Sequence, residues 1–153
     1  MKAETKNKIR IVGLLLFILY LVALFYFLFF AESYGRVMEE RSYSYNLEPF
    51  KEINRFWVHR ETLGIRAVLL NLVGNVLGFV PFGAILPVIN SQSRSFFKIL
   101  LLSFEFSFIV EGIQLVFKVG SFDVDDILLN TLGGILGYLI FVICNRIRRR
   151  KFG

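Results

Sequence analysis

The sequence predicts an all-α membrane protein with four transmembrane helices, both termini in the cytoplasm and a short amphipathic helix in the outer loop. Of the 153 residues, 56% are hydrophobic and 20% are charged, and the mean hydropathy is +0.62. Soluble domains usually contain about a quarter of charged residues. In addition, the apolar residues form four long stretches, and the basic residues gather outside them. The length leaves room for one membrane domain, residues 1–153, and for no separate soluble domain.

The first stretch, residues 11–30, consists of 20 uncharged residues, which matches the ~20 that a helix needs to cross the hydrocarbon core. A cleaved signal peptide would have a shorter apolar centre of about 7–15 residues and then a small-x-small cleavage site. The segment AESYG that follows is a poor match to such a site. We therefore expect a retained span.

The second and fourth stretches, residues 67–89 and 127–143, contain no charged residue. Spanning helices tolerate proline when neighbouring groups satisfy the freed backbone groups, so Pro81 predicts a kink in the second helix. The fourth stretch has 17 residues. This length is short but sufficient if Asp126 lies at the membrane interface.

The third stretch, residues 96–117, contains Lys98, Glu105 and Glu111. Lys98 lies near one end and can extend to the membrane surface. Both glutamates lie too deep for that. We expect Glu105, near the middle of the membrane, to be neutral or paired with a polar group that the sequence does not identify.

The charges of the loops predict the orientation. The loop of residues 31–66 holds six basic and six acidic residues, and residues 118–126 have a net charge of −2, so both loops are predicted to be external. The remaining segments carry an excess of Lys and Arg, which assigns them to the cytoplasm. Their basic residues are Lys2, Lys6, Lys8, Arg10, Arg94, Lys98, Arg146, Arg148, Arg149, Arg150 and Lys151.

This placement also bears on possible partners. It accounts for 11 of the 18 Lys and Arg residues, so the net charge of +6 does not indicate a nucleic-acid partner. A positive-inside anchor that contacts anionic lipid is the favoured interpretation of the basic tail. Cys144 is the single cysteine and His59 the single histidine. We therefore expect no internal disulfide, no metal site and no cofactor.

Two segments of the sequence are similar to each other. Residues 70–79 (LNLVGNVLGF) and 129–138 (LNTLGGILGY) share five identities in ten positions. The match fits a parallel repeat of two helical hairpins, but Leu, Gly and Asn are also common in packed spans, and both explanations stay open. Each segment contains a G-x-x-x-G spacing, for which close helix packing is favoured over ligand contact. The glycines are Gly74, Gly78, Gly133 and Gly137.

Polar residues from three of the spans are predicted to lie in one layer. A rise of about 1.5 Å per residue places them at similar depth in the outer half of the bilayer, and their i, i+3 and i, i+4 spacings place those of each helix on one face. Polar groups at such depth are costly unless they face the bundle interior or water. The candidate binding residues are Asn71, Asn75, Glu111, Gln114, Asp123, Asp125, Asp126 and Asn130.

These residues also have a structural interpretation. Asn and Gln often only join helices, at about 0.6 kcal/mol each, and for Asn71 and Asn75 both roles stay open. For Glu111 a functional role is favoured because three aspartates follow it closely. Four buried carboxylates would repel one another, so at least one has to be neutral or to have a basic partner. The candidate partners are Arg55, Arg60, Arg66 and Lys118.

A short amphipathic helix is predicted in the outer loop. From Pro49 onward, Phe50, Ile53 and Trp57 recur at i, i+3 and i+7 among charged residues, and proline is common in the first turn of a helix. Such a helix is either an ordinary interfacial anchor, with Trp57 at the headgroups, or a cover for the polar layer.

Four segments of the chain resemble the VanZ-like family of membrane proteins. They occur in the family's order over about the last two thirds of the chain, at residues 46–53 (NLEPFKEI), 71–87 (NLVGNVLGFVPFGAILP), 111–114 (EGIQ) and 122–138 (FDVDDILLNTLGGILGY). Many members have an arginine shortly before the aspartates, where this chain has Val119, Gly120 and Ser121. If an Arg–Asp pair acts in the family, a different base has to replace it here.

The resemblance implies a protein of the bacterial cytoplasmic membrane, and the family's best-known member is associated with low-level resistance to teicoplanin. We expect a non-enzymatic protein that binds a lipid or a lipid-linked cell-wall precursor at the outer leaflet and so lowers susceptibility to glycopeptide and lipoglycopeptide antibiotics. The alternative is an enzyme that modifies such a headgroup, with Glu111 or Asp126 as acid or base. A transporter comes third, because four spans would need a homo-oligomer to form a path.

Overall fold

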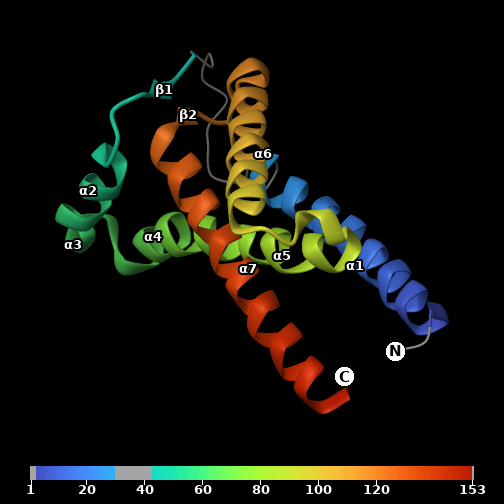
Figure 1. Ribbon diagram of the computed structural model, residues 1–153. Helices are drawn as coiled ribbons and strands as arrows, with labels where there is room; N and C mark the ends of the chain where they lie inside the picture. Colours follow the sequence, from blue (N-terminus) through green and yellow to red (C-terminus); the bar gives the residue numbers. More distant parts are fainter. Residues whose placement is uncertain (1–2, 30–42, 153) are drawn as a thin grey trace.

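The computed structural model describes residues 3–29 and 43–152 and is mostly helical (Figure 1). Four of its helices are long and apolar enough to cross a membrane, as predicted. They are α1 (Ala3–Phe29), the continuous run from Ile65 to Ile89, α6 (Phe96–Phe117) and α7 (Val124–Phe152). Residue 30 and residues 31–42, which belong to the predicted first span and outer loop, lie outside the described residues.

The second long helix is not uniformly α-helical. It begins as α4 (Ile65–Val68), passes through a π-helical turn, η2 (Leu69–Val73), and continues as α5 (Gly74–Ile89). The helix continues through Pro81 and Pro87, and the kink expected at Pro81 stays a prediction. The π-helical turn was not predicted. Within it, the Asn71 side chain donates a hydrogen bond of 2.9 Å to the carbonyl of Ala67. After α5, a 3-10 turn, η3 (Ser91–Ser93), leads to α6.

The two similar segments differ in local structure. Residues 70–79 start inside the π-helical turn, whereas residues 129–138 are α-helical throughout. The internal repeat therefore stays a prediction. The first four residues of the two segments differ in backbone structure.

The segment between the first two long helices contains the predicted helix and a feature that was not predicted. Helix α2 (Lys51–Val58) is followed by α3 (Arg60–Leu63). The helix starts at Lys51 rather than at Pro49, because Phe50 has a left-handed backbone with φ 67°. Two short strands, β1 (Tyr45–Asn46) and β2 (Phe122–Asp123), pair in parallel, with Asn46 opposite Asp123.

Helices α5 and α7 pack closely through glycine. A Cβ atom on Gly133 or Gly137 of α7 would overlap a backbone carbonyl of α5, that of Val76 or that of Val80. The packing role predicted for this G-x-x-x-G pair is therefore confirmed. The prediction is wrong for Gly74 of α5, which has nothing within 4 Å of a Cβ position.

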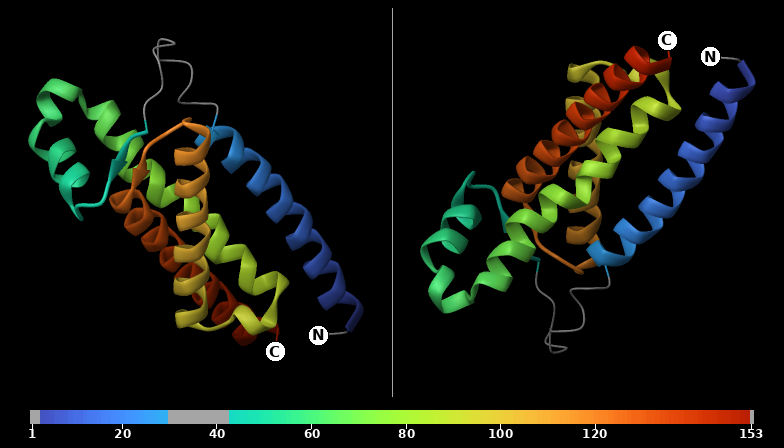
Figure 2. Two further views of the ribbon diagram at one scale, coloured as in Figure 1. Left: turned by 90° about the horizontal axis from the view of Figure 1, so that it is seen from above. Right: turned by 90° about the horizontal axis from the view of Figure 1, so that it is seen from below.

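Aromatic residues fill the space between α1, α5 and α6. The Phe82 ring stacks on that of Phe106 with 5.0 Å between centroids, and Phe17 of α1 lies 5.8 Å from Phe82. The Tyr20 hydroxyl donates a hydrogen bond of 2.9 Å to the carbonyl of Gly78. Helix α1 therefore runs beside α5, and both ends of the chain lie at the end of the bundle opposite to β1 and β2 (Figure 2).

The glycine packing gives a matched pair of variants. We expect Gly133→Ala to lower the free energy of unfolding by about 1–3 kcal/mol, as overpacking usually does, because its methyl group would overlap the carbonyl of Val76. Gly74→Ala should be neutral or slightly stabilising, because the position is open and helical. Thermal denaturation of the detergent-solubilised chain measures the difference, and equal midpoints for the two variants would contradict the packing.

Candidate functional site

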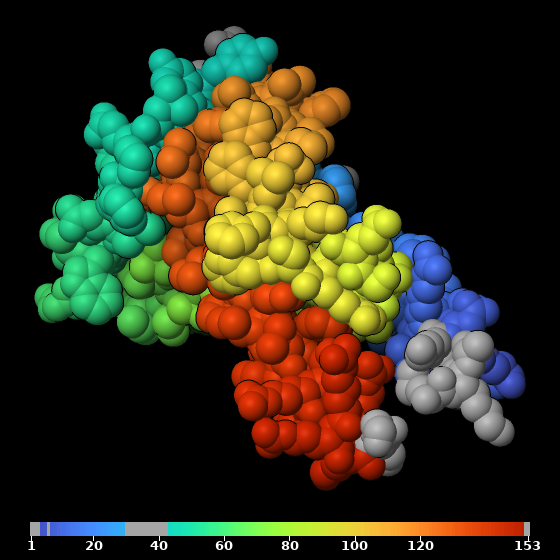
Figure 3. Space-filling view, viewed as in Figure 1, coloured from blue at the N-terminus to red at the C-terminus, as the bar shows by residue number. Residues whose placement is uncertain are grey.

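A polar cavity of about 420 Å³ lies at the end of the bundle where α6 ends and α7 begins. Five of the predicted residues line it: Asn71, Gln114, Asp123, Asp125 and Asp126. Helix α2 forms one wall, and its segment lies beside the first turns of α7 (Figure 3). The cavity therefore combines residues from three long helices with residues of α2.

Asp125 fixes the position of α2. Its carboxylate accepts hydrogen bonds from the backbone N–H groups of Phe50 at 2.5 Å, Glu52 at 2.8 Å and Ile53 at 3.1 Å. The first N–H groups of a helix have no partner within the helix, and a negative charge there is stabilising. Although Asp125 is only 1% exposed, its charge is compensated by these three donors. Asp125 is thus the N-terminal cap of α2, although it lies 72 to 75 residues after the N–H groups that it binds.

Asp123 connects β1 to the start of α7. One of its carboxylate oxygens accepts hydrogen bonds from the Asn46 side-chain amide at 3.0 Å and from the N–H of Asp125 at 2.8 Å. The second bond makes Asp123 the cap of α7. Its own N–H donates to Glu111 Oε2 at 3.2 Å. Glu111, 2% exposed, therefore supports the loop from within the bundle.

Asp126 and Gln114 connect the cavity to the long helices. Asn75 Nδ2 donates to Asp126 Oδ1 at 2.5 Å and so joins α5 to α7. Gln114 Nε2 donates to the carbonyl of Leu28 at 2.9 Å and joins α6 to α1. Both Asp126 and Gln114 also line the cavity. Asp126 and Gln114 thus both join helices by hydrogen bonds and form part of the cavity wall.

Asn130 does not line the cavity. It is 1% exposed, and its side-chain amide donates to Ser107 Oγ at 2.9 Å, between α7 and α6. In the described part of the chain, Asn130 Oδ1 and the nearby Ser103 Oγ have no hydrogen-bond partner. The predicted layer is therefore split, because Asn130 lies one helical turn beyond Asp126, toward the middle of the bundle.

Two of the four candidate basic partners, Arg55 and Arg60, bind groups other than the predicted carboxylates. Arg55 pairs with Glu52 of α2 at 2.6 Å, and Arg60 donates to the carbonyl of Trp57 at 3.0 Å. Backbone and side-chain amides are the donors to Asp123 and Asp125. Arg55 nevertheless lines the cavity, so it is a basic residue within reach of a bound ligand.

Glu105 lies outside this network. Its side chain is exposed on the surface of α6, whereas Ser103 and Ser107 of the same helix are buried. Within the described residues, no hydrogen bond or ion pair joins Glu105 to another side chain. A partner inside the bundle, one of the two states expected for Glu105, is therefore not observed.

Several cavity residues were not predicted as part of the site, among them Glu52, Phe56, Gly120 and Ser121, whereas Arg55 was expected only as a candidate partner of the carboxylates. The segment NLEPFKEI contains the three N–H groups that donate to Asp125. Backbone donors of this kind cannot be recognised from residue types. Gly120 packs against Gln114, where a Cβ would lie 3.3 Å from that side chain. Among the described residues, no three His, Cys, Asp or Glu side chains are grouped to hold a metal ion.

Four helices of membrane-spanning length and a carboxylate-rich cavity at one end define a multi-pass membrane protein. The chain belongs to the VanZ/LLP1 family, whose profile matches residues 17–145. It is 31% identical over 135 residues to Protein VanZ of Enterococcus faecium. The aligned residues cover 87% of this chain and 75% of that protein. No solved structure matches the chain.

The cap on α2 can be tested with Asp125→Ala. Helices shorter than about 12–15 residues are marginal alone, so loss of three charge-assisted hydrogen bonds should release the eight-residue helix α2 from α7. We expect amide hydrogen exchange of residues 50–58 to rise at least tenfold while that of α6 stays unchanged. Glu61→Ala, which removes an exposed carboxylate of α3, is the control. Unchanged exchange of residues 50–58 in Asp125→Ala would refute the cap.

Proposed function

We propose that this VanZ-family protein lies in the bacterial cytoplasmic membrane and lowers susceptibility to glycopeptide antibiotics such as teicoplanin by binding a lipid or lipid-linked headgroup at the outer leaflet. The observation that carries the proposal is the 420 Å³ cavity, which is walled by carboxylates and amides at one end of the bundle of long apolar helices. Polar groups at membrane depth mark functional sites when they face a cavity.

The chemistry of the wall indicates the kind of headgroup. Carboxylate and amide oxygens accept hydrogen bonds from hydroxyl and ammonium groups, and Asn71, Gln114 and Asp126 also line the cavity. Arg55 adds a guanidinium group, which suits the phosphate that links such a headgroup to its lipid. A sugar or an amine on a lipid phosphate is the ligand class that fits these groups.

An enzyme that modifies such a headgroup is the alternative. Asp126 lines the cavity and Glu111 lies behind its wall, which gives two carboxylates in different environments. However, Asp123 and Asp125 are occupied as helix caps. Among the described residues, those that line the cavity include no cysteine or histidine that could act as nucleophile or base. Binding is therefore favoured. Lipid extracts from a deletion strain and a complemented strain separate the two, because only an enzyme changes headgroup chemistry.

The proposed orientation places the cavity outside and both termini in the cytoplasm. It is supported by the loop charges and by the common position of the termini at the opposite end of the bundle (Figure 2). Glycopeptides act outside the membrane, which agrees with this orientation.

The binding role predicts the effect of two isosteric variants. Glu111→Gln and Asp126→Asn remove a charge but keep the oxygens that accept from Asp123 N–H and Asn75, so the fold should survive. We expect each variant to abolish the effect on teicoplanin susceptibility, measured in a strain that depends on the plasmid-borne protein. If the two residues act as a unit, the double variant should be no worse than the more damaging single one.

Two controls accompany this measurement. Glu105→Gln makes the same chemical change on the exposed face of α6, and Phe25→Leu changes α1 outside the cavity; both should keep full protection. Membrane abundance has to be measured for every variant. Full protection by well-expressed Glu111→Gln and Asp126→Asn would show that the carboxylates only hold the fold.

The orientation has its own test. Single cysteines are introduced as Glu61→Cys in α3 and Gln92→Cys in η3, both exposed, on a Cys144→Ser background. In intact cells whose outer layers are permeable to the reagent, an impermeant maleimide should label position 61 and leave position 92 unlabelled. The reverse pattern would invert the proposed topology.

A further inference from the structure

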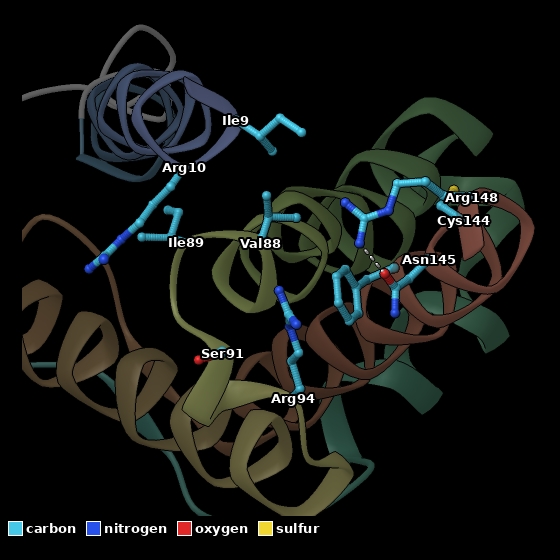
Figure 4. Close-up of a pocket in the computed structure, with 10 residues that line it drawn as sticks. Ile9, Arg10, Val88, Ile89, Ser91, Arg94, Cys144, Asn145 and Arg148 are labelled. Atoms are coloured by element: carbon cyan, nitrogen blue, oxygen red, sulfur yellow. Dashed lines mark hydrogen bonds between the residues drawn. The ribbon is translucent and has the colours of Figure 1, made fainter. Parts of the chain in front are cut away.

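A second, larger cavity of about 640 Å³ lies at the opposite end of the bundle, where both termini are found. It is formed by the N-terminal part of α1, the end of α5, η3 and the C-terminal part of α7 (Figure 4). Ile9, Val88, Ile89 and Phe141 give it apolar walls. Nothing in the proposed antibiotic-related function uses this cavity.

Arginines line the same cavity. Arg94 is held in place because its Nε donates to the carbonyl of Pro87 at 2.9 Å and its guanidinium lies 5.7 Å from the centre of the Phe141 ring. Arg148 Nη2 donates to Asn145 Oδ1 at 2.7 Å. Figure 4 shows both guanidinium groups directed into the space between Val88 and Asn145, whereas that of Arg10 points away from it. Two positioned guanidinium groups thus face one space.

The charges around this space have one sign. Among the described residues, those that line the cavity include no carboxylate. Glu4 of α1 is paired with Lys8 at 2.8 Å on the surface. Two guanidinium groups without a carboxylate between them repel each other, and an anion between them removes that repulsion. Guanidinium groups bind phosphate oxygens with two parallel hydrogen bonds.

We propose that this cavity binds the phosphate of an anionic phospholipid from the leaflet on the side of the termini. The apolar walls favour a lipid over free phosphate, because Ile9 and Ile89 belong to the candidate spans and therefore border the acyl region. Gly13 lies in contact with Val88 and Ile89, where a Cβ would be 3.5 Å from each side chain. The acyl chains therefore lie along the mouth of the cavity, while the phosphate lies between Arg94 and Arg148.

Cys144 provides a built-in reporter for this site. It is exposed, lines the cavity and is the single cysteine of the chain. In detergent solution, N-ethylmaleimide should alkylate Cys144 of the full chain several-fold more slowly when phosphatidylglycerol is added. Phosphatidylcholine, whose headgroup has no net charge, should protect far less, and inorganic phosphate should not protect.

Variants of the arginines identify which guanidinium groups bind the lipid phosphate. Arg148→Gln should raise the phosphatidylglycerol concentration for half-protection by about tenfold, as expected for the loss of a charge-assisted hydrogen bond, and Arg94→Gln/Arg148→Gln should raise it further. Arg148→Gln alone leaves the bond between Arg94 and Pro87 intact, so it tests binding even if the double variant fails to fold. Arg149→Gln removes the same charge from α7 outside the cavity and should leave protection unchanged.

The proposal has three opposing outcomes. Equal loss of protection in Arg148→Gln and Arg149→Gln would show diffuse attraction to the basic tail in place of a built site. Equal protection by phosphatidylcholine would remove the role of charge, and protection by inorganic phosphate alone would replace the lipid with a free anion. Because these variants lie at the end of the bundle opposite to Glu111 and Asp126, the result is independent of the proposed antibiotic-related function.

Discussion

The arrangement of the end of the bundle where α6 ends and α7 begins depends on the contact between the Asp125 carboxylate and the first N–H groups of α2. An eight-residue helix has little stability of its own, and α2 has no fully buried residue. Its position therefore comes mainly from its N-terminus. Asp125 is in turn positioned by Asp123, which caps α7 and holds Asn46, and the backbone of Asp123 is held by Glu111. The walls of the cavity therefore depend on a chain of contacts, in which each of these carboxylates holds the segment that positions the next one.

The long helices supply the second constraint. Backbones approach closely only where no side chain intervenes, and Gly133 and Gly137 allow α7 to contact the carbonyls of α5. This contact brings Asn75 within hydrogen-bonding distance of Asp126. At the other end of the bundle, the same two helices provide Val88 and Phe141 on the walls of the arginine-lined cavity. Close packing in the middle thus sets the geometry of both ends.

The sequence predicted the features that depend on composition along one segment. Hydropathy located the four long helices because a membrane requires about 20 apolar residues in a row, and the spacing of Asn71, Gln114 and Asp126 predicted that they share one depth. The partner of each polar group was not predictable in the same way. Asp125 binds backbone donors more than 70 residues away, and backbone groups look the same at every position. Similarly, the direction of Asn130 toward Ser107 and the exposure of Glu105 depend on how α6 and α7 are rotated about their axes, which spacing within one helix does not determine.

The π-helical turn Leu69–Val73 has a consequence for the direction in which the chain leaves the bundle. A π-helical turn holds one residue more than an α-helical turn, and one residue corresponds to a rotation of about 100° around the helix axis. The residues of α4, which precede the turn in the same helix, are therefore offset by that angle from the face they would occupy in an uninterrupted α-helix. The turn therefore sets the angle between two parts of the chain. Helix α5 keeps its glycine contact with α7, while α3 and α4 lie in the direction that lets α2 reach Asp125. Without this extra residue, the four long helices would remain, but the segment that contains α2 and α3 would turn away from the cavity.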